Sequence, residues 1–117
     1  MKMPVRGLTL VEMLIVIVIV GVLVAVLIPN LLRAREQAFD TGTQACLKEL
    51  ATRQEAAKTA APFEYDSTLD AATLASCNGV TFMVATVGPN TYAYEAKHYA
   101  GVNTYSVAPG TSVQVVR

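Results

Sequence analysis

The stretch that decides the fold runs from Gly7 to Pro29 and reads GLTLVEMLIVIVIVGVLVAVLIP. Between positions 8 and 28 the residues that are not apolar are Thr9, Glu12 and Gly21. As a helix these 21 residues would be about 31 Å long, which matches the hydrocarbon core of a bilayer. A cleavable secretory signal has a shorter apolar region and a small-residue cleavage site after it, whereas a proline follows directly here. The sequence therefore predicts a retained single membrane span.

The rest of the 117-residue chain has the composition of an ordinary soluble domain. Nine Lys and Arg residues balance nine Asp and Glu residues, and charged residues make up only 15% of the chain. This balance leaves no basic surface for the phosphates of a nucleic acid. The apolar content of 53% excludes a disordered chain. We expect one small domain attached to the span.

Glu12 is the exception within the apolar stretch, because a carboxylate there costs a few kcal/mol on insertion scales. One interpretation is that Glu12 lies near enough to the helix start to reach the lipid headgroups. Its surroundings favour a functional interpretation. A short basic leader precedes it, with Lys2 and Arg6 as its cations and Gly7 as its last residue.

This arrangement resembles the N-terminus of the type IV pilin family. The resemblance implies that a leader peptidase removes residues 1–7 by cutting between Gly7 and Leu8, and that the new amine of Leu8 is methylated. It also implies that Glu12 is the family's glutamate, fifth in the mature chain. Gly21 and Pro29 match as well, and in the family the segment between them loses regular helix inside the filament.

The resemblance covers about the first 30 residues, and the chain departs from the family in three respects. Leu8 stands where phenylalanine is usual, the chain is short, and no cysteine lies near its C-terminus. Positive charges flank the span on both sides and set no clear orientation. The family's orientation places the leader in the bacterial cytoplasm and the globular part outside the inner membrane.

After the span, residues 30–61 are rich in strong helix formers and end before Pro62, which predicts that the helix continues to about Ala60. Pro29 removes a backbone donor and is expected to weaken the helix locally. One stripe on this helix is predicted to pack on a sheet, namely Leu32, Phe39, Cys46, Leu50 and Ala57. A second stripe is either a contact with neighbouring subunits or a solvated alanine face, namely Leu31, Ala34, Ala38, Ala45, Ala56 and Ala60.

Residues 62–79 read as a loop, with a helical turn predicted at residues 71–75. Beyond it, segments rich in Val, Thr, Tyr and Phe alternate with Gly, Pro and Asn turns. These segments are residues 80–87, 92–99, 104–108 and 112–116. The pattern predicts an α+β fold, in which a long helix packs on a small antiparallel sheet of three or four strands. The predicted divisions are a leader at 1–7, a span at 8–29 and a helix-plus-sheet domain at 30–117.

Cys46 lies on the stripe that faces the predicted sheet, and Cys77 comes just before the first strand. The compartment outside the inner membrane is oxidising, so we expect a disulfide between them, worth a few kcal/mol. The alternative is two separate buried thiols, since a free cysteine packs well as a small apolar residue.

The sequence offers little support for catalysis. A single histidine, His98, in a Tyr-rich strand is more often structural than a general base. Four serines lack the context of an activated nucleophile, namely Ser67, Ser76, Ser106 and Ser112. The acidic group of Glu64, Asp66 and Asp70 fits no calcium loop and reads as a solvated face. We predict no enzyme activity, metal or cofactor.

The resemblance to the type IV pilin family implies the function of a pilin, a structural subunit that polymerises into a type IV pilus. The resemblance implies leader peptidase and dedicated assembly machinery as partners, and adhesion, twitching motility or DNA uptake as the use of the filament. A pseudopilin of a type II secretion system is the alternative, although no Asp or Glu follows Glu95 to bind the calcium typical of the major pseudopilin. A single-span membrane enzyme or sensor is a third, less favoured hypothesis.

Overall fold

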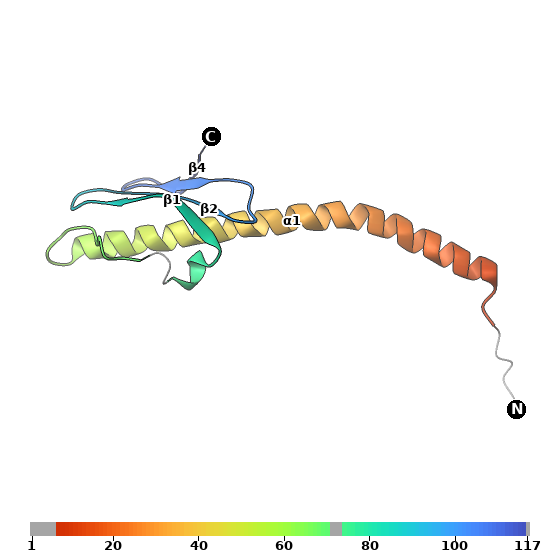
Figure 1. Ribbon diagram of the computed structural model, residues 1–117. Coiled ribbons are helices and arrows are strands. Elements are labelled where there is room, and N and C mark those ends of the chain that lie inside the picture. The colour runs from red at the N-terminus through yellow and green to blue at the C-terminus, as the bar shows by residue number, and fades with distance from the viewer. Residues whose placement is uncertain (1–6, 71–73, 117) are drawn as a thin grey trace, which may run out of the picture. The chain divides into compact units, whose positions relative to one another are not determined.

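The computed structural model describes residues 7–70 and 74–116 and contains one long helix, one short 3-10 turn and four strands (Figure 1). Their bounds are α1 Leu10–Thr59, η2 Ala75–Cys77, β1 Val80–Val87, β2 Tyr92–His98, β3 Tyr105–Val107 and β4 Gln114–Val115. The chain divides into two compact units between Ala34 and Arg35.

The first unit is the apolar part of α1. Every described side chain from residue 7 to residue 34 is exposed, so this segment has no partner within its own unit. It makes α1 long and apolar enough to cross a membrane. The helix runs without a break through Gly21 and Pro29. The loss of helix between these two residues was expected only inside a filament and stays a prediction.

In the second unit the four strands form one antiparallel sheet in the order β1-β2-β3-β4, which confirms the α+β prediction and settles the strand number at four. In Figure 1 the sheet lies along the C-terminal half of α1. The bounds of β1 agree with the prediction, whereas β3 and β4 are shorter than predicted. A turn closed by Thr111 shortens them, because its hydroxyl accepts from the amide of Ala108 at 3.1 Å. A bulge interrupts β1 between Phe82 and Val84.

The core lies between β2 and one face of α1. Along β2 buried and half-buried residues alternate, so the inward side chains are Tyr92, Tyr94, Ala96 and His98. The buried residues of α1 are Asp40, Thr43, Cys46, Leu47, Leu50 and Gln54. Apart from Cys46, which precedes Leu47 directly, they are spaced alternately by three and four residues, which is the spacing of one helix face.

The predicted apolar stripe on α1 is therefore only partly right. Cys46 and Leu50 are buried, but Leu32 is exposed and Phe39 and Ala57 are half-buried. The true line of contact passes through polar residues, which a search for apolar periodicity cannot find. Every residue of the predicted small-residue stripe is exposed in this structure, so its contact with neighbouring subunits stays a prediction.

Gln54 is a buried polar residue that ties the loop after α1 to the helix. Its side chain is fully buried. Its Oε1 accepts from the backbone amide of Asp66 at 2.8 Å, and its Nε2 donates to the carbonyl of Asp66 and to the hydroxyl of Tyr94, each at 2.8 Å. The amide thus pairs both backbone groups of Asp66 and leaves none of its own atoms without a partner.

Asp40 holds the loop between β2 and β3 in a similar way. Its Oδ1 accepts from the amides of Val102 and Asn103 at 2.9 and 3.2 Å, and its Oδ2 accepts from Nδ2 of Asn103 at 2.7 Å. A Cβ at Gly101 would lie 2.5 Å from Oδ1, so a side chain there would push the loop off the carboxylate. Of the helical turn predicted at residues 71–75, positions 71–73 lie outside the described residues, and the turn that is present is η2.

Candidate functional site

The predicted site residue Glu12 lies in the first turn of α1, where it forms a reciprocal pair with Thr9. The backbone amide and the hydroxyl of Thr9 donate to Oε2 of Glu12 at 2.8 and 3.0 Å. In return the backbone amide of Glu12 donates to the Thr9 hydroxyl at 3.2 Å. This is a capping box, which satisfies free amide groups at a helix start with side-chain oxygens.

Sequence reasoning missed the role of Thr9, although the signal was present as Thr9-x-x-Glu12, the spacing typical of a capping box. The pairing matters because it gives the carboxylate two donors from its own chain. A carboxylate with such partners is less costly in an apolar setting than a bare one.

Gly7 and Leu8 stand outside the helix, directly before its cap. Both are exposed and neither has helical structure. A Cβ at Gly7 would meet no atom within 4 Å. An exposed, non-helical peptide bond next to a capped helix is the kind of site that a peptidase can reach. The remaining leader residues, including Lys2 and Arg6, lie outside the described residues.

The predicted disulfide is present. Cys46 and Cys77 are joined at an S–S distance of 2.05 Å and close a separation of 31 residues. Both residues are buried. The bond attaches η2 to the middle of the helix face that carries the sheet.

We expect the Cys46→Ser/Cys77→Ser chain to unfold at a lower temperature than the native chain. Closing a loop of this length is worth about 3–4 kcal/mol in the entropic model of the unfolded chain. Thermal unfolding of the full-length chain in detergent, followed by circular dichroism, measures the loss. Alkylation without reductant provides the control, because it should label neither cysteine of the native chain. Equal stability of the two chains would contradict a stabilising role.

Two of the other candidate residues, His98 and Asp66, have structural partners. His98 is buried and stacks on Phe39 and Tyr99 with ring centroids 4.4 and 4.6 Å away, and its Nδ1 accepts from the amide of Ala100 at 3.1 Å. Asp66 accepts from the amide and hydroxyl of Thr68, and these bonds lower the pKa of its carboxyl. Across residues 7–70 and 74–116, no three His, Cys, Asp or Glu residues are grouped so that they could hold a metal ion.

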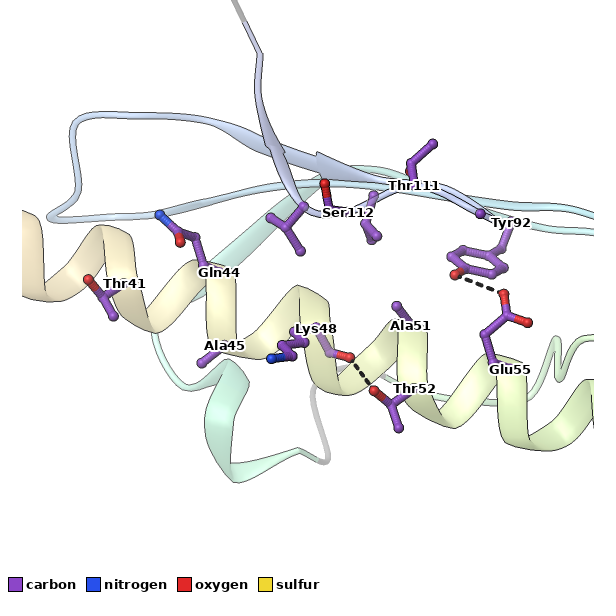
Figure 2. Close-up of a pocket in the computed structure, with 13 residues that line it drawn as sticks. Thr41, Gln44, Ala45, Lys48, Ala51, Thr52, Glu55, Tyr92, Thr111 and Ser112 are labelled. Carbon is purple, nitrogen blue, oxygen red and sulfur yellow. Dashed lines mark hydrogen bonds between the residues drawn. The ribbon is translucent and has the colours of Figure 1, made fainter.

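A groove of about 860 Å³ runs between α1 and the segment that joins β3 to β4 (Figure 2). Its walls include Ala45, Lys48, Ala51, Tyr92 and Val113.

At one end of this groove the Tyr92 hydroxyl donates to Oε1 of Glu55 at 3.4 Å. Burial and the neighbouring Glu55 carboxylate raise the pKa of Tyr92 to about 12, so Tyr92 stays protonated at neutral pH. The groove is thus mainly apolar, with one cation and one hydrogen-bonded carboxylate on its helix wall.

Two comparisons with known proteins bear on these features. Residues 2–28 match the family model described as the prokaryotic N-terminal methylation motif. The chain is also 36% identical, over 117 aligned residues, to the type IV wide pilus major component PilA4 of Thermus thermophilus. That alignment covers 92% of this chain and 85% of the relative, so the similarity extends through the disulfide-bonded domain as well as the apolar helix.

Proposed function

This chain belongs to the type IV pilin family, and from that premise we propose how it is matured and assembled. Pilins are structural subunits, so the chain serves to build a filament rather than to catalyse a reaction. The observation that carries the detailed proposal is the capped, fully exposed apolar helix with its single carboxylate, Glu12.

Maturation is the first step of the proposal. A prepilin peptidase at the cytoplasmic face of the inner membrane cuts between Gly7 and Leu8, and the new amine of Leu8 is methylated. Three features support this step: the matched motif at residues 2–28, the exposure of both residues, and the absence of helix at the bond. The mature subunit then remains in the inner membrane as a single-pass protein, with its disulfide-bonded domain on the outer side of that membrane, until it is assembled.

Assembly is the second step. The pilus assembly machinery transfers the apolar segment from lipid to a bundle of other copies, and the finished filament lies outside the cell. Moving the segment from lipid into such a bundle gives van der Waals packing but little hydrophobic free energy, because lipid tails are as apolar as leucine. A polar pair inside the bundle can fix the axial register between neighbouring helices, which is the best-attested role of buried polar groups. We assign this role to the Glu12 carboxylate of one copy and the Leu8 amine of another.

The mass of the mature subunit tests the maturation step. Mass spectrometry of subunits from sheared surface filaments should show the loss of residues 1–7 and one added methyl group on Leu8. The Gly7→Val chain is the matched control, because it keeps the leader charges and Glu12 but blocks approach to the bond. An intact leader in assembled filaments, or a cut after residue 28, would contradict the proposal.

The pseudopilin alternative gains no support from these observations. The relative that aligns with this chain is named as a pilus component. No acidic residue follows Glu95 in the sequence, which leaves the C-terminal loops without carboxylates for calcium.

A further inference from the structure

The groove beside α1 has a cation that nothing in the described chain neutralises. Within residues 7–70 and 74–116 the Lys48 ammonium makes no hydrogen bond and no ion pair, whereas Glu55 at the end of the same groove receives the Tyr92 hydroxyl. Figure 2 shows Lys48 on the helix wall between Ala45 and Thr52. The groove therefore offers an apolar floor with one unpaired positive charge.

An aromatic side chain and an acid project together from the turn after α1. Phe63 is 62% exposed, and its φ of 64° lies in the left-handed region that non-glycine residues rarely adopt. Glu64 follows it, is exposed, and has no hydrogen bond or ion pair in the part of the chain that is described. A large apolar side chain that is mostly exposed at such a backbone position leaves apolar surface available for a partner.

The residues next to this pair are firmly held, so Phe63 and Glu64 are presented on a fixed support. The amide of Tyr65 donates to the carbonyl of Pro89 at 3.3 Å, and the Tyr65 ring meets the Tyr92 ring edge to face at 4.9 Å. Lys58 lies 5.0 Å from the centre of the Tyr65 ring, and Gln54 pairs both backbone groups of Asp66. Little conformational entropy remains to be lost when such a support binds a partner.

We propose that Phe63 and Glu64 of one copy dock into the groove of a neighbouring copy, with Phe63 on the apolar floor and Glu64 against Lys48. The proposal rests on the pilin function, because it requires neighbouring copies with parallel helices. The two surfaces lie at different places on one domain, so the contact is heterologous and repeats without closing. The turn that carries Phe63 and Glu64 begins at Ala60, directly after the end of α1, and Ala60 lies 12 residues beyond Lys48. Docking therefore requires a displacement of roughly 18 Å between the two copies along α1.

The other exposed apolar side chains of the domain fit this groove less well. Tyr99 is 79% exposed but stacks on its own His98, and no acid adjoins it. Met83 is 63% exposed, but Glu95 and Lys97 on the neighbouring strand carry opposite charges. Of Phe63, Met83 and Tyr99, only Phe63 adjoins an acid that makes no ion pair within the described residues, and this combination complements the groove.

Cysteine cross-linking in sheared filaments tests the contact directly. The Lys48→Cys/Glu64→Cys chain should give a ladder of dimers, trimers and higher oligomers on a non-reducing gel. Each copy carries one cysteine in its groove and one in its turn, so it can be cross-linked to a neighbour on either side. The two single variants are the controls and should give no ladder. Filaments of the double variant without a ladder, or with dimers alone, would overturn the proposal.

Charge reversal supplies a second measurement. Lys48→Glu and Glu64→Lys should each reduce the yield of sheared filaments about fivefold or more, the effect of one or two kcal/mol, and the combined variant should restore it. Tyr99→Ala is the control for a general effect of exposed residues and should leave the yield unchanged. Single reversals without effect, or no recovery in the double variant, would overturn the docking. If the unaltered chain forms no filaments, the pilin function itself is at fault.

Discussion

Glu12→Gln should leave the chain inserted, cleaved and folded, yet reduce its incorporation into filaments about tenfold or more. The free amine of Leu8 and the carboxylate of Glu12 are each costly in an apolar bundle and are tolerated as a pair. Removing one partner of a buried charge pair costs about 2–5 kcal/mol, largely because the other charge is left unpaired. Filament yield after shearing, normalised to the amount of subunit in the membrane, measures the effect.

Glutamine is the informative substitution because it separates the charge from the helix cap. The amide can occupy the same place in a capping box with Thr9, so α1 should begin at the same residue. Thr9→Ala is the matched control, because it removes the capping hydroxyl but keeps the carboxylate, at a cost of about 1 kcal/mol to the cap. Normal filaments from Glu12→Gln at normal subunit levels would show that the charge has no part in assembly.

Gln54→Leu should lower the free energy of unfolding of the domain by roughly 2–4 kcal/mol. The substitution keeps a buried apolar volume but leaves the amide and carbonyl of Asp66 and the hydroxyl of Tyr94 without partners. An unsatisfied buried polar group costs about 1–3 kcal/mol, and part of this cost is relieved where water reaches the loop. We expect the largest loss of order in the loop that follows α1.

Chemical denaturation of the full-length chain in detergent, followed by near-ultraviolet circular dichroism of the tyrosines, measures this change. The disulfide remains intact in the experiment, so the comparison isolates the hydrogen bonds of Gln54. Gln37→Leu makes the same chemical change at an exposed position of α1 and should alter the stability by less than about 0.5 kcal/mol. Equal effects at the two positions would contradict the role assigned to Gln54.

The parts of the fold that could be predicted from the sequence are those with a local signal. The apolar run from Met13 to Ile28 indicates a span by its length alone, and the strands are marked by β-branched and aromatic residues between turns. The Cys46–Cys77 disulfide could be expected once the domain was placed in an oxidising compartment.

The polar members of the core had no such signal. Asp40 reaches residues 62 and 63 positions later in the chain, and Gln54 reaches a hydroxyl 40 positions away. Hydrogen bonds over these separations satisfy the buried polar groups only after the sheet has docked, so they leave no local periodicity. The Thr9–Glu12 pair, in contrast, has a local signal, the Thr-x-x-Glu spacing of a capping box. Because the pair lies in an apolar segment, the charge of Glu12 was interpreted and its role as a helix cap was not.

The bulge in β1 bears on which kind of polymer this chain can form. Residues 80–87 read VTFMVATV, an uncharged run of high β propensity at the open edge of the sheet. A regular edge of this composition is a template for strand addition and, in the extreme, for amyloid. The irregularity between Phe82 and Val84 twists that edge away from a flat partner. In a subunit that polymerises, this irregularity guards against uncontrolled strand addition at the edge of the sheet.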